Sequence, residues 1–262
     1  MFETKKRRRK RLMKTPLPST WLSMVVRNVP YYRRLPPQDR LELQGLVQVF
    51  LAEKKFEGLG GLRLTDEIRV TIAAQACILL LRRKTDFYPS LVSILVYPYA
   101  YVAPVQRRES GGIVSESIEA LAGQTWDKGS LVLSWNDVLR GAADVRDGRN
   151  VVFHEFAHQL DNEAGVADGA PLLPDPSMYA AWAEVFGREY RALIQDIEQN
   201  RPALIDSYAA MNPAEFFAVA TEFFFEMPVP LRERHAELYG LLRAFYLQDP
   251  ASLSGPAEQA DF

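Results

Sequence analysis

The chain has 262 residues, of which 48% are hydrophobic, 24% are charged and 11% are aromatic, and its formal net charge at pH 7 is −2. This composition is typical of a folded globular protein and excludes collagen-like, low-complexity and wholly disordered chains. The single cysteine, Cys77, excludes an internal disulfide and a four-cysteine zinc site, and it favours a reducing compartment. The longest apolar stretch, Val70 to Leu81, is too short to cross a bilayer.

Charge is distributed unevenly along the chain. Residues 1–14 carry eight basic side chains and one acidic side chain, a charge of +7, so the other 248 residues carry −9. Pro16 and Pro18 interrupt the apolar run that follows, which argues against a secretory signal. We interpret 1–18 as a flexible basic arm of a cytoplasmic protein. A solvated tail is the favoured interpretation, and direct binding to nucleic acid is not expected; binding to nucleic acid or to an acidic partner is the alternative.

The first half of the chain predicts helices and then two strands. Apolar residues recur at intervals of three and four within 21–57, which indicates helical structure, and GLGG at 58–61 is a flexible break. Thr65 is a plausible N-cap for a buried helix that ends at the basic residues 82–84. β-Branched and aromatic residues predict strands over 90–102 and 130–135.

The second half predicts three helices and a loop, over 150–161, 178–199 and 213–225, with the loop at 164–177. Asn150 is a possible N-cap of the first of these helices. Asn212 and Pro213 are a suitable N-cap and first position for the last one. The expected class is α+β and mostly helical, with a single domain over 19–250 and a C-terminal tail over 251–262.

Two of the three histidines stand in the motif His154-Glu155-Phe156-Ala157-His158. On a helix, positions i and i+4 share one face at a Cβ separation of about 6 Å, so both imidazoles can reach one Zn²⁺. Glu155 points one helical step away, where its carboxylate can take a proton from a water on the ion and later deliver one to a leaving amine. The motif therefore predicts a zinc site with a general base.

Zinc in a catalytic site needs a third protein ligand, and the sequence offers several candidates. His235 lies in a highly charged stretch that is typical of a surface. Asp161 follows His158 by three residues, and we expect it to be a hydrogen-bonded helper rather than a ligand. Glu215 and Glu222 lie two turns apart on an apolar helix, where buried glutamates need a cation or a partner. Glu215 is the preferred ligand, and Glu222 is a supporting residue or the fallback ligand.

Four segments together resemble the Mlc titration factor A family, and they are spread over 56–226: FEGLGGLRLTDEIRVTIAAQA, GQTW with LVLSW, NVVFHEFAHQLD, and NPAEFFAVATEFFFE. The resemblance implies a zincin-like, gluzincin-like metallopeptidase core similar to the protease domain of anthrax lethal factor, with a small sheet and an HExxH active-site helix. It implies that His154, His158 and Glu215 are the ligands of one zinc ion and that Glu155 is the general base. It also implies that Tyr208, seven residues before the third ligand, stabilises the tetrahedral intermediate or the leaving group.

The same resemblance implies aminopeptidase-type activity on peptides and binding to Mlc, a sugar-responsive transcriptional repressor. The expected function is therefore a zinc-dependent peptidase with a regulatory role. The alternative is a non-catalytic protein that titrates a repressor and holds a structural zinc. For the peptidase, Leu131 to Trp135 is a candidate edge strand to which an extended substrate adds.

Overall fold

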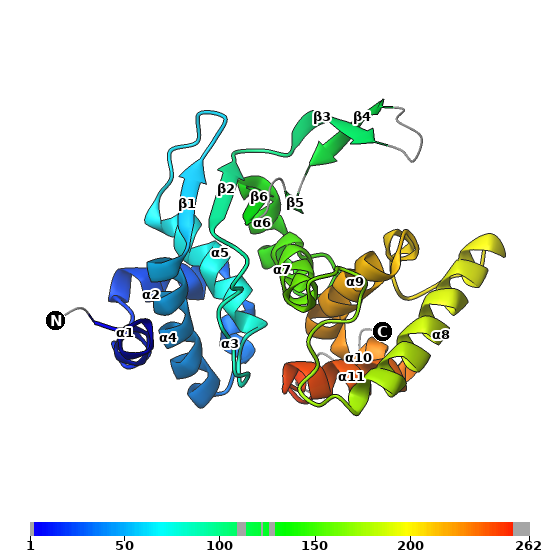
Figure 1. Cartoon of the computed structure of the whole chain (residues 1–262). Coiled ribbons are helices and arrows are strands. Elements are labelled where there is room, and N and C mark those ends of the chain that lie inside the picture. The colour runs from blue at the N-terminus through cyan, green and yellow to red at the C-terminus, as the bar shows by residue number, and fades with distance from the viewer. Residues whose placement is uncertain (1–2, 109–113, 122, 126–128, 254–262) are drawn as a thin grey trace.

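The computed structural model describes residues 3–108, 114–121, 123–125 and 129–253, and it is mostly helical (Figure 1). The helices are α1 (Lys5–Leu12), α2 (Ser19–Asn28), α3 (Tyr31–Arg34), α4 (Pro37–Glu53), α5 (Asp66–Ile78), α6 (Trp135–Ala143), α7 (Val151–Asp161), α8 (Met178–Glu198), α9 (Pro213–Glu226), α10 (Pro228–Arg234) and α11 (Ala236–Tyr246). The strands are β1 (Lys55–Gly58), β2 (Ser93–Tyr97), β3 (Tyr101–Arg108), β4 (Val114–Leu121), β5 (Gly123–Thr125) and β6 (Ser130–Ser134). Short 3₁₀ turns are η1 (Asn162–Ala164), η2 (Ser207–Ala210) and η3 (Pro250–Ser252).

Prolines divide the region 21–57, which was expected to be helical, into separate helices. Pro30 precedes α3, and Pro36 precedes α4, whose first residue is Pro37. A proline has no backbone N–H and disfavours helical geometry in the residue before it, so each one ends the preceding helix. The segment is therefore three helices, and its last residues form β1.

Residues 5–12, which were expected to belong to a flexible arm, form the helix α1. Arg9 joins this helix to the end of α4 through a two-pronged ion pair with Glu53. The division of the chain into an arm, a single domain and a tail stays a prediction.

The main sheet has the strand order β1-β2-β6-β5, in which β1, β2 and β6 are parallel and β5 is antiparallel to β6. The strand expected over 90–102 is divided into β2 and β3, and β3 pairs with β4 in a separate two-stranded sheet. Ser134 ends β6 and caps α6 by accepting a hydrogen bond from Asp137 N. Because β6 lies between β2 and β5, both of its edges are already paired. The prediction that substrate adds to this strand is therefore wrong.

The core is formed where α5, α7 and α9 meet. Every residue from Val70 to Leu81 is at most 1% exposed, which confirms the predicted buried helix, although α5 ends at Ile78. On the other side of α7, the ring of Phe153 packs against that of Phe225 on α9 at a centroid distance of 5.2 Å. Figure 1 shows α7 between the N-terminal half, with α4 and α5, and the C-terminal half, with α8 to α11. None of the described helices has the length and apolar content that a membrane-spanning helix requires.

Candidate metal centre

Helix α7 places His154 and His158 side by side, as their spacing predicts. Asn150 begins the helix: its side-chain oxygen accepts hydrogen bonds from the backbone N–H groups of Val152 and Phe153 at 3.1 and 3.0 Å. One turn separates the two histidines, and their Nε2 atoms lie 3.2 Å apart. Apolar residues hold the opposite face of the helix in the core, so both rings point into the same cleft.

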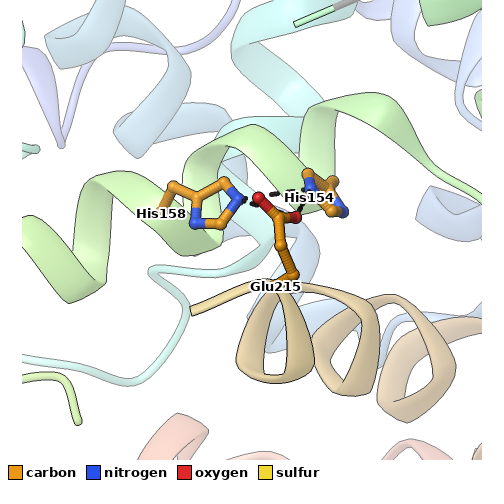
Figure 2. Close-up of side chains that lie close together, drawn as sticks. All are labelled: His154, His158 and Glu215. Atoms are coloured by element: carbon orange, nitrogen blue, oxygen red, sulfur yellow. Dashed lines mark hydrogen bonds and ion pairs between the residues drawn. The ribbon is translucent and has the colours of Figure 1, made fainter. Parts of the chain in front are cut away.

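Glu215 reaches these rings from the first turn of α9. Asn212 caps this helix and accepts a hydrogen bond from Glu215 N at 2.9 Å, so the predicted cap is confirmed. The carboxylate Oε2 of Glu215 lies 3.0 Å from Nε2 of His154 and 3.4 Å from Nε2 of His158. Figure 2 shows the Glu215 carboxylate rising from α9 toward both imidazoles.

The spacing of the three ligand atoms fits tetrahedral coordination of a metal ion. Ligand atoms at about 2.0–2.1 Å from an ion in a regular tetrahedron lie about 3.3–3.4 Å from one another. The observed separations of 3.0, 3.2 and 3.4 Å are close to this value. Within the described part of the chain, these residues form the one group of three whose ligand atoms are near enough to hold a metal ion.

The electrostatics of the three residues favour a cation between them. Burial raises the pKa of Glu215, but hydrogen bonds from His154 and His158 outweigh it and lower that pKa to about 2. Burial has the opposite effect on His154 and lowers its pKa, but the hydrogen bonds of this ring to Glu215 and Glu222 outweigh burial and raise the pKa to about 10. The carboxylates therefore stabilise positive charge at His154 Nε2, which is the position that a metal ion would take.

Glu222 lies two turns after Glu215 and contacts the other side of His154. Its Oε1 lies 2.7 Å from Nδ1 of that ring, and its Oε2 accepts a hydrogen bond from Asn150 N at 2.5 Å. It therefore orients the imidazole and leaves Nε2 to face Glu215. Glu226, one turn further along α9, accepts a hydrogen bond from Asn150 Nδ2 at 3.1 Å. Burial raises the pKa values of both Glu222 and Glu226.

Glu155 and Tyr208 line the same cleft, which has a volume of about 1440 Å³. Glu155 is 6% exposed, and burial raises its pKa, which makes the carboxylate a stronger base. Tyr208 belongs to η2, and its ring centroid lies 5.9 Å from that of His154. Glu155 lies on the same helix as the histidine pair, and the structure brings Tyr208 to this pair from a distant segment.

Asp161 and His235 lie away from the ligand atoms. Asp161 is fully buried, and its Oδ2 accepts a hydrogen bond from Gly169 N at 2.8 Å, so it fastens the loop that follows α7. Burial raises the pKa of Asp161 to about 6. The Nδ1 atom of His235 lies 2.8 Å from Glu189 Oε2 on α8, outside the cleft.

Two contributions to the cleft were missed in the sequence. One is the network around Asn150, whose side chain also donates to Gln75 Oε1 on α5 at 3.1 Å. The other is the ion pair of Arg149 with Asp206, at 2.8 Å. Glu226 follows Glu222 by one helical turn, and that spacing could have indicated a shared role. The contacts of Asn150 with Gln75 and of Arg149 with Asp206 join distant segments, so no local sequence pattern indicates them.

Taken together, the fold and the site define a class of protein: a mostly helical protein in which two buried helices share a site suited to a metal ion. The chain belongs to the glucose-regulated metallo-peptidase M90 family, whose model matches residues 3–247.

Relatives cover most of the chain. It is 42% identical to an uncharacterized protein of Synechocystis sp., over 93% of this chain and 89% of the relative. It is 33% identical to Mlc titration factor A of Pectobacterium atrosepticum, over 85% and 84% of the two chains. It is 31% identical to Mlc titration factor A of Escherichia coli O1:K1 / APEC, over 89% and 88%. These matches confirm the resemblance drawn from the four sequence segments.

Proposed function

We propose that this protein is a zinc-dependent metallopeptidase whose active-site helix is α7. The observation that carries the proposal is the triangle of His154 Nε2, His158 Nε2 and Glu215 Oε2, with sides of 3.0, 3.2 and 3.4 Å. Membership of a metallopeptidase family supports it.

Zinc is the ion that this donor set fits best. Two imidazole nitrogens and one carboxylate oxygen are typical zinc ligands, whereas Ca²⁺ and Mg²⁺ take oxygen ligands almost alone. Three protein ligands leave a fourth position open, as catalytic zinc sites do. When bound, one zinc ion per chain would act as a Lewis acid on a peptide carbonyl and would lower the pKa of a coordinated water.

Glu155 is the proposed general base and acid. Its burial beside the histidines raises its pKa, so it can take a proton from water and return it to the leaving amine. The phenol of Tyr208, which lines the same cleft, is the proposed hydrogen-bond donor to the oxyanion that forms on the substrate. Glu222 holds His154 in the orientation that directs Nε2 to the site. Asp161 holds the following loop in place.

The proposed substrates are peptides, with hydrolysis of the aminopeptidase type. The zincin-like core and the cytoplasmic location stay predictions. The family description and the relatives named Mlc titration factor A support a regulatory role, and we propose binding to an Mlc-like transcriptional repressor. The second candidate function is that of a non-catalytic titration factor that holds a structural zinc. The name Mlc titration factor A of the relatives favours this function.

Glu155→Gln separates these functions. The variant should retain zinc, because residue 155 lies outside the ligand triangle, and should lose peptidase activity by about 10²–10⁴-fold, because it cannot accept a proton. His154→Ala should lose both zinc and activity. Metal content by atomic absorption and turnover of an amino-acid anilide panel, with and without chelator, provide the measurements.

The control is Glu184→Gln, which makes the same chemical change at an exposed position on α8. Peptidase activity that persists in Glu155→Gln would contradict the catalytic role of this residue. If wild-type protein holds zinc, hydrolyses nothing in the panel and binds the repressor equally well with either residue at 155, the non-catalytic function is correct.

A further inference from the structure

Helix α1 is fastened to the body of the protein by one of its own basic residues. The guanidinium of Arg9 donates from Nε and Nη2 to the two carboxylate oxygens of Glu53, at 2.7 Å each. Its Nη1 also pairs with Asp86, and its Cζ lies 4.7 Å from the ring centroid of Phe87. Two carboxylates and an aromatic ring therefore hold this side chain, which is only 17% exposed.

A second contact holds the end of the helix. Gly45 on α4 allows a close approach, because a Cβ at this position would lie 2.8 Å from the backbone oxygen of Met13. The side chain of Gln48, one turn later on α4, donates to the backbone oxygens of Leu12 and Thr15. Residues 5–15 are therefore docked along α4, and the orientation of α1 is defined.

Four other cations of this segment point outward, whereas Lys5, Arg8 and Arg11 contact neighbouring groups of the protein. Lys6 and Lys10 lie one turn apart on α1 with Arg7 beside them, and Lys14 follows at the same interval in the turn just after the helix. All four side chains are exposed, and within the described part of the chain none of them forms an ion pair. We call these four residues the outer face of α1. Like charges at this spacing repel one another, so the face favours a polyanion.

We propose that the outer face of α1 binds the phosphate backbone of double-stranded DNA without reading its sequence. The phosphates of a duplex form a stiff array of negative charges, and a row of cations held by a docked helix can match it. The face has no aromatic or apolar side chain to stack on bases or to insert between them, so backbone contacts alone are available.

An acidic membrane is the competing partner, and the structure favours it less. Helices that lie in a membrane interface bury an apolar face, whereas α1 has no buried residue and its apolar end, Leu12 and Met13, faces the protein core. Lipids move laterally, so a flexible basic tail would serve a membrane as well as a fixed row. The ion pairs of Arg9 fix the positions of the outward cations, which suits a partner whose own charges are fixed.

The position of α1 keeps this surface separate from the metal centre. Figure 1 shows α1 at the edge of the molecule beside α4, with α4 and α5 between it and α7. DNA bound along the outer face would therefore leave the cleft accessible. The proposal does not depend on peptidase activity.

The test measures the fluorescence anisotropy of a labelled 30-base-pair duplex of random sequence with the full-length protein. Four phosphate contacts predict a slope of about −3.6 in log affinity against log salt, hence a loss of about 100-fold between 50 and 200 mM. The variant Lys6→Gln/Lys10→Gln/Lys14→Gln leaves one contact, so the same salt change should cost it only about 3-fold. The control Lys55→Gln/Arg63→Gln/Lys84→Gln removes equal charge from exposed positions elsewhere and should behave as wild type.

Three results would overturn the proposal. The first is no binding to the duplex at 50 mM salt. The second is an equal loss of affinity in the control, which would assign binding to net charge. The third is binding to phosphatidylserine vesicles that depends on the three lysines while the duplex does not bind. Arg9→Gln tests the docked helix itself: it retains all four outward cations, and unchanged DNA affinity would show that a fixed row is not needed.

Discussion

Glu222 shows how a residue outside the proposed set of metal ligands can position one of them, His154. Its carboxylate bonds Nδ1 of His154 and accepts the backbone N–H of Asn150, so both of its oxygens are used. Such carboxylate–histidine pairs fix the orientation of the ring and raise its basicity. The same carboxylate also links α9 to the first residue before α7, so ring orientation and helix position are coupled.

Glu222→Gln should therefore weaken zinc binding by about 10–100-fold. The amide retains one oxygen, so either His154 Nδ1–H or Asn150 N–H faces an NH₂ group instead of an acceptor, and two donors then repel. Competition with a chromophoric chelator measures the affinity. Glu184→Gln serves as the matched control, and an unchanged zinc affinity in Glu222→Gln would show that the ring is oriented by other contacts.

The sequence predicted the positions of some site residues but not of others. The histidine pair follows from helical periodicity alone, because the spacing of the two residues determines their common face. Glu215 and Glu222 could not be distinguished in that way, since both lie on one face of the same helix. Which of them meets Nε2 depends on how α9 packs against α7, and that is a property of the tertiary fold.

Asp206 both caps the turn η2 and joins it to the start of α7. Asp206 caps the turn by accepting a hydrogen bond from Tyr208 N at 2.9 Å, and it pairs with Arg149 at 2.8 Å. Arg149 directly precedes the cap of α7, and its backbone N–H donates to Glu226 at 2.9 Å. These contacts therefore fix the position of Tyr208 at the cleft relative to α7, the helix that carries the histidines.

Two substitutions at Asp206 separate these contacts. Asn can still cap the turn but cannot form the ion pair, which is exposed and should contribute less than about 1 kcal/mol. Ala loses both, with a further cost of about 0.5–2 kcal/mol in the free energy of unfolding. Urea denaturation measures stability, and kcat with KM measures catalysis. We expect Asp206→Ala to lower kcat more than it raises KM, and equal kcat in all three proteins would contradict the role in positioning Tyr208.

The pH dependence of this contact has a definite sign. The hydrogen bond from Tyr208 N, aided by Arg149, lowers the pKa of Asp206 below its ordinary value of 3.8. A carboxyl whose pKa is lowered on folding contributes stability above its unfolded value, and this is lost as the pH falls through the folded value. The difference in stability between wild type and Asp206→Asn should therefore shrink below about pH 3.8, whereas it should be constant between pH 5 and 7.

Elements were easier to predict by type than by boundary. The caps at Asn150 and Asn212 are local signals and locate the starts of α7 and α9. The helical prediction over 21–57 gave no boundaries at Pro30 and Pro36, although the effect of a proline on the backbone is equally local. The position of β6 inside the sheet could not be known, because pairing with β2 and β5 is a long-range property.

The three proposed metal ligands come from two segments, and His154 and Glu215 are 61 residues apart in sequence, so a bound ion would cross-link the chain. Helices α7 and α9 already pack through Phe153 and Phe225, and the ion would add a polar contact at the open end of the same interface. Binding that is confined to the folded state adds RT ln(1 + [L]/Kd) to the free energy of unfolding, about 2.7 kcal/mol at a hundredfold excess over Kd.

Zinc at that excess should therefore raise Tm by about 5–10 °C for a chain of this length, and a chelator should reverse the rise. Glu215→Ala removes the ligand that α9 supplies, so its Tm should respond much less to zinc while its fold is retained. Differential scanning calorimetry measures both, with Glu184→Gln as the variant that should match wild type. If zinc raises the Tm of Glu215→Ala as much as that of wild type, α9 takes no part in holding the ion. The proposed ligand set of His154, His158 and Glu215 would then be wrong.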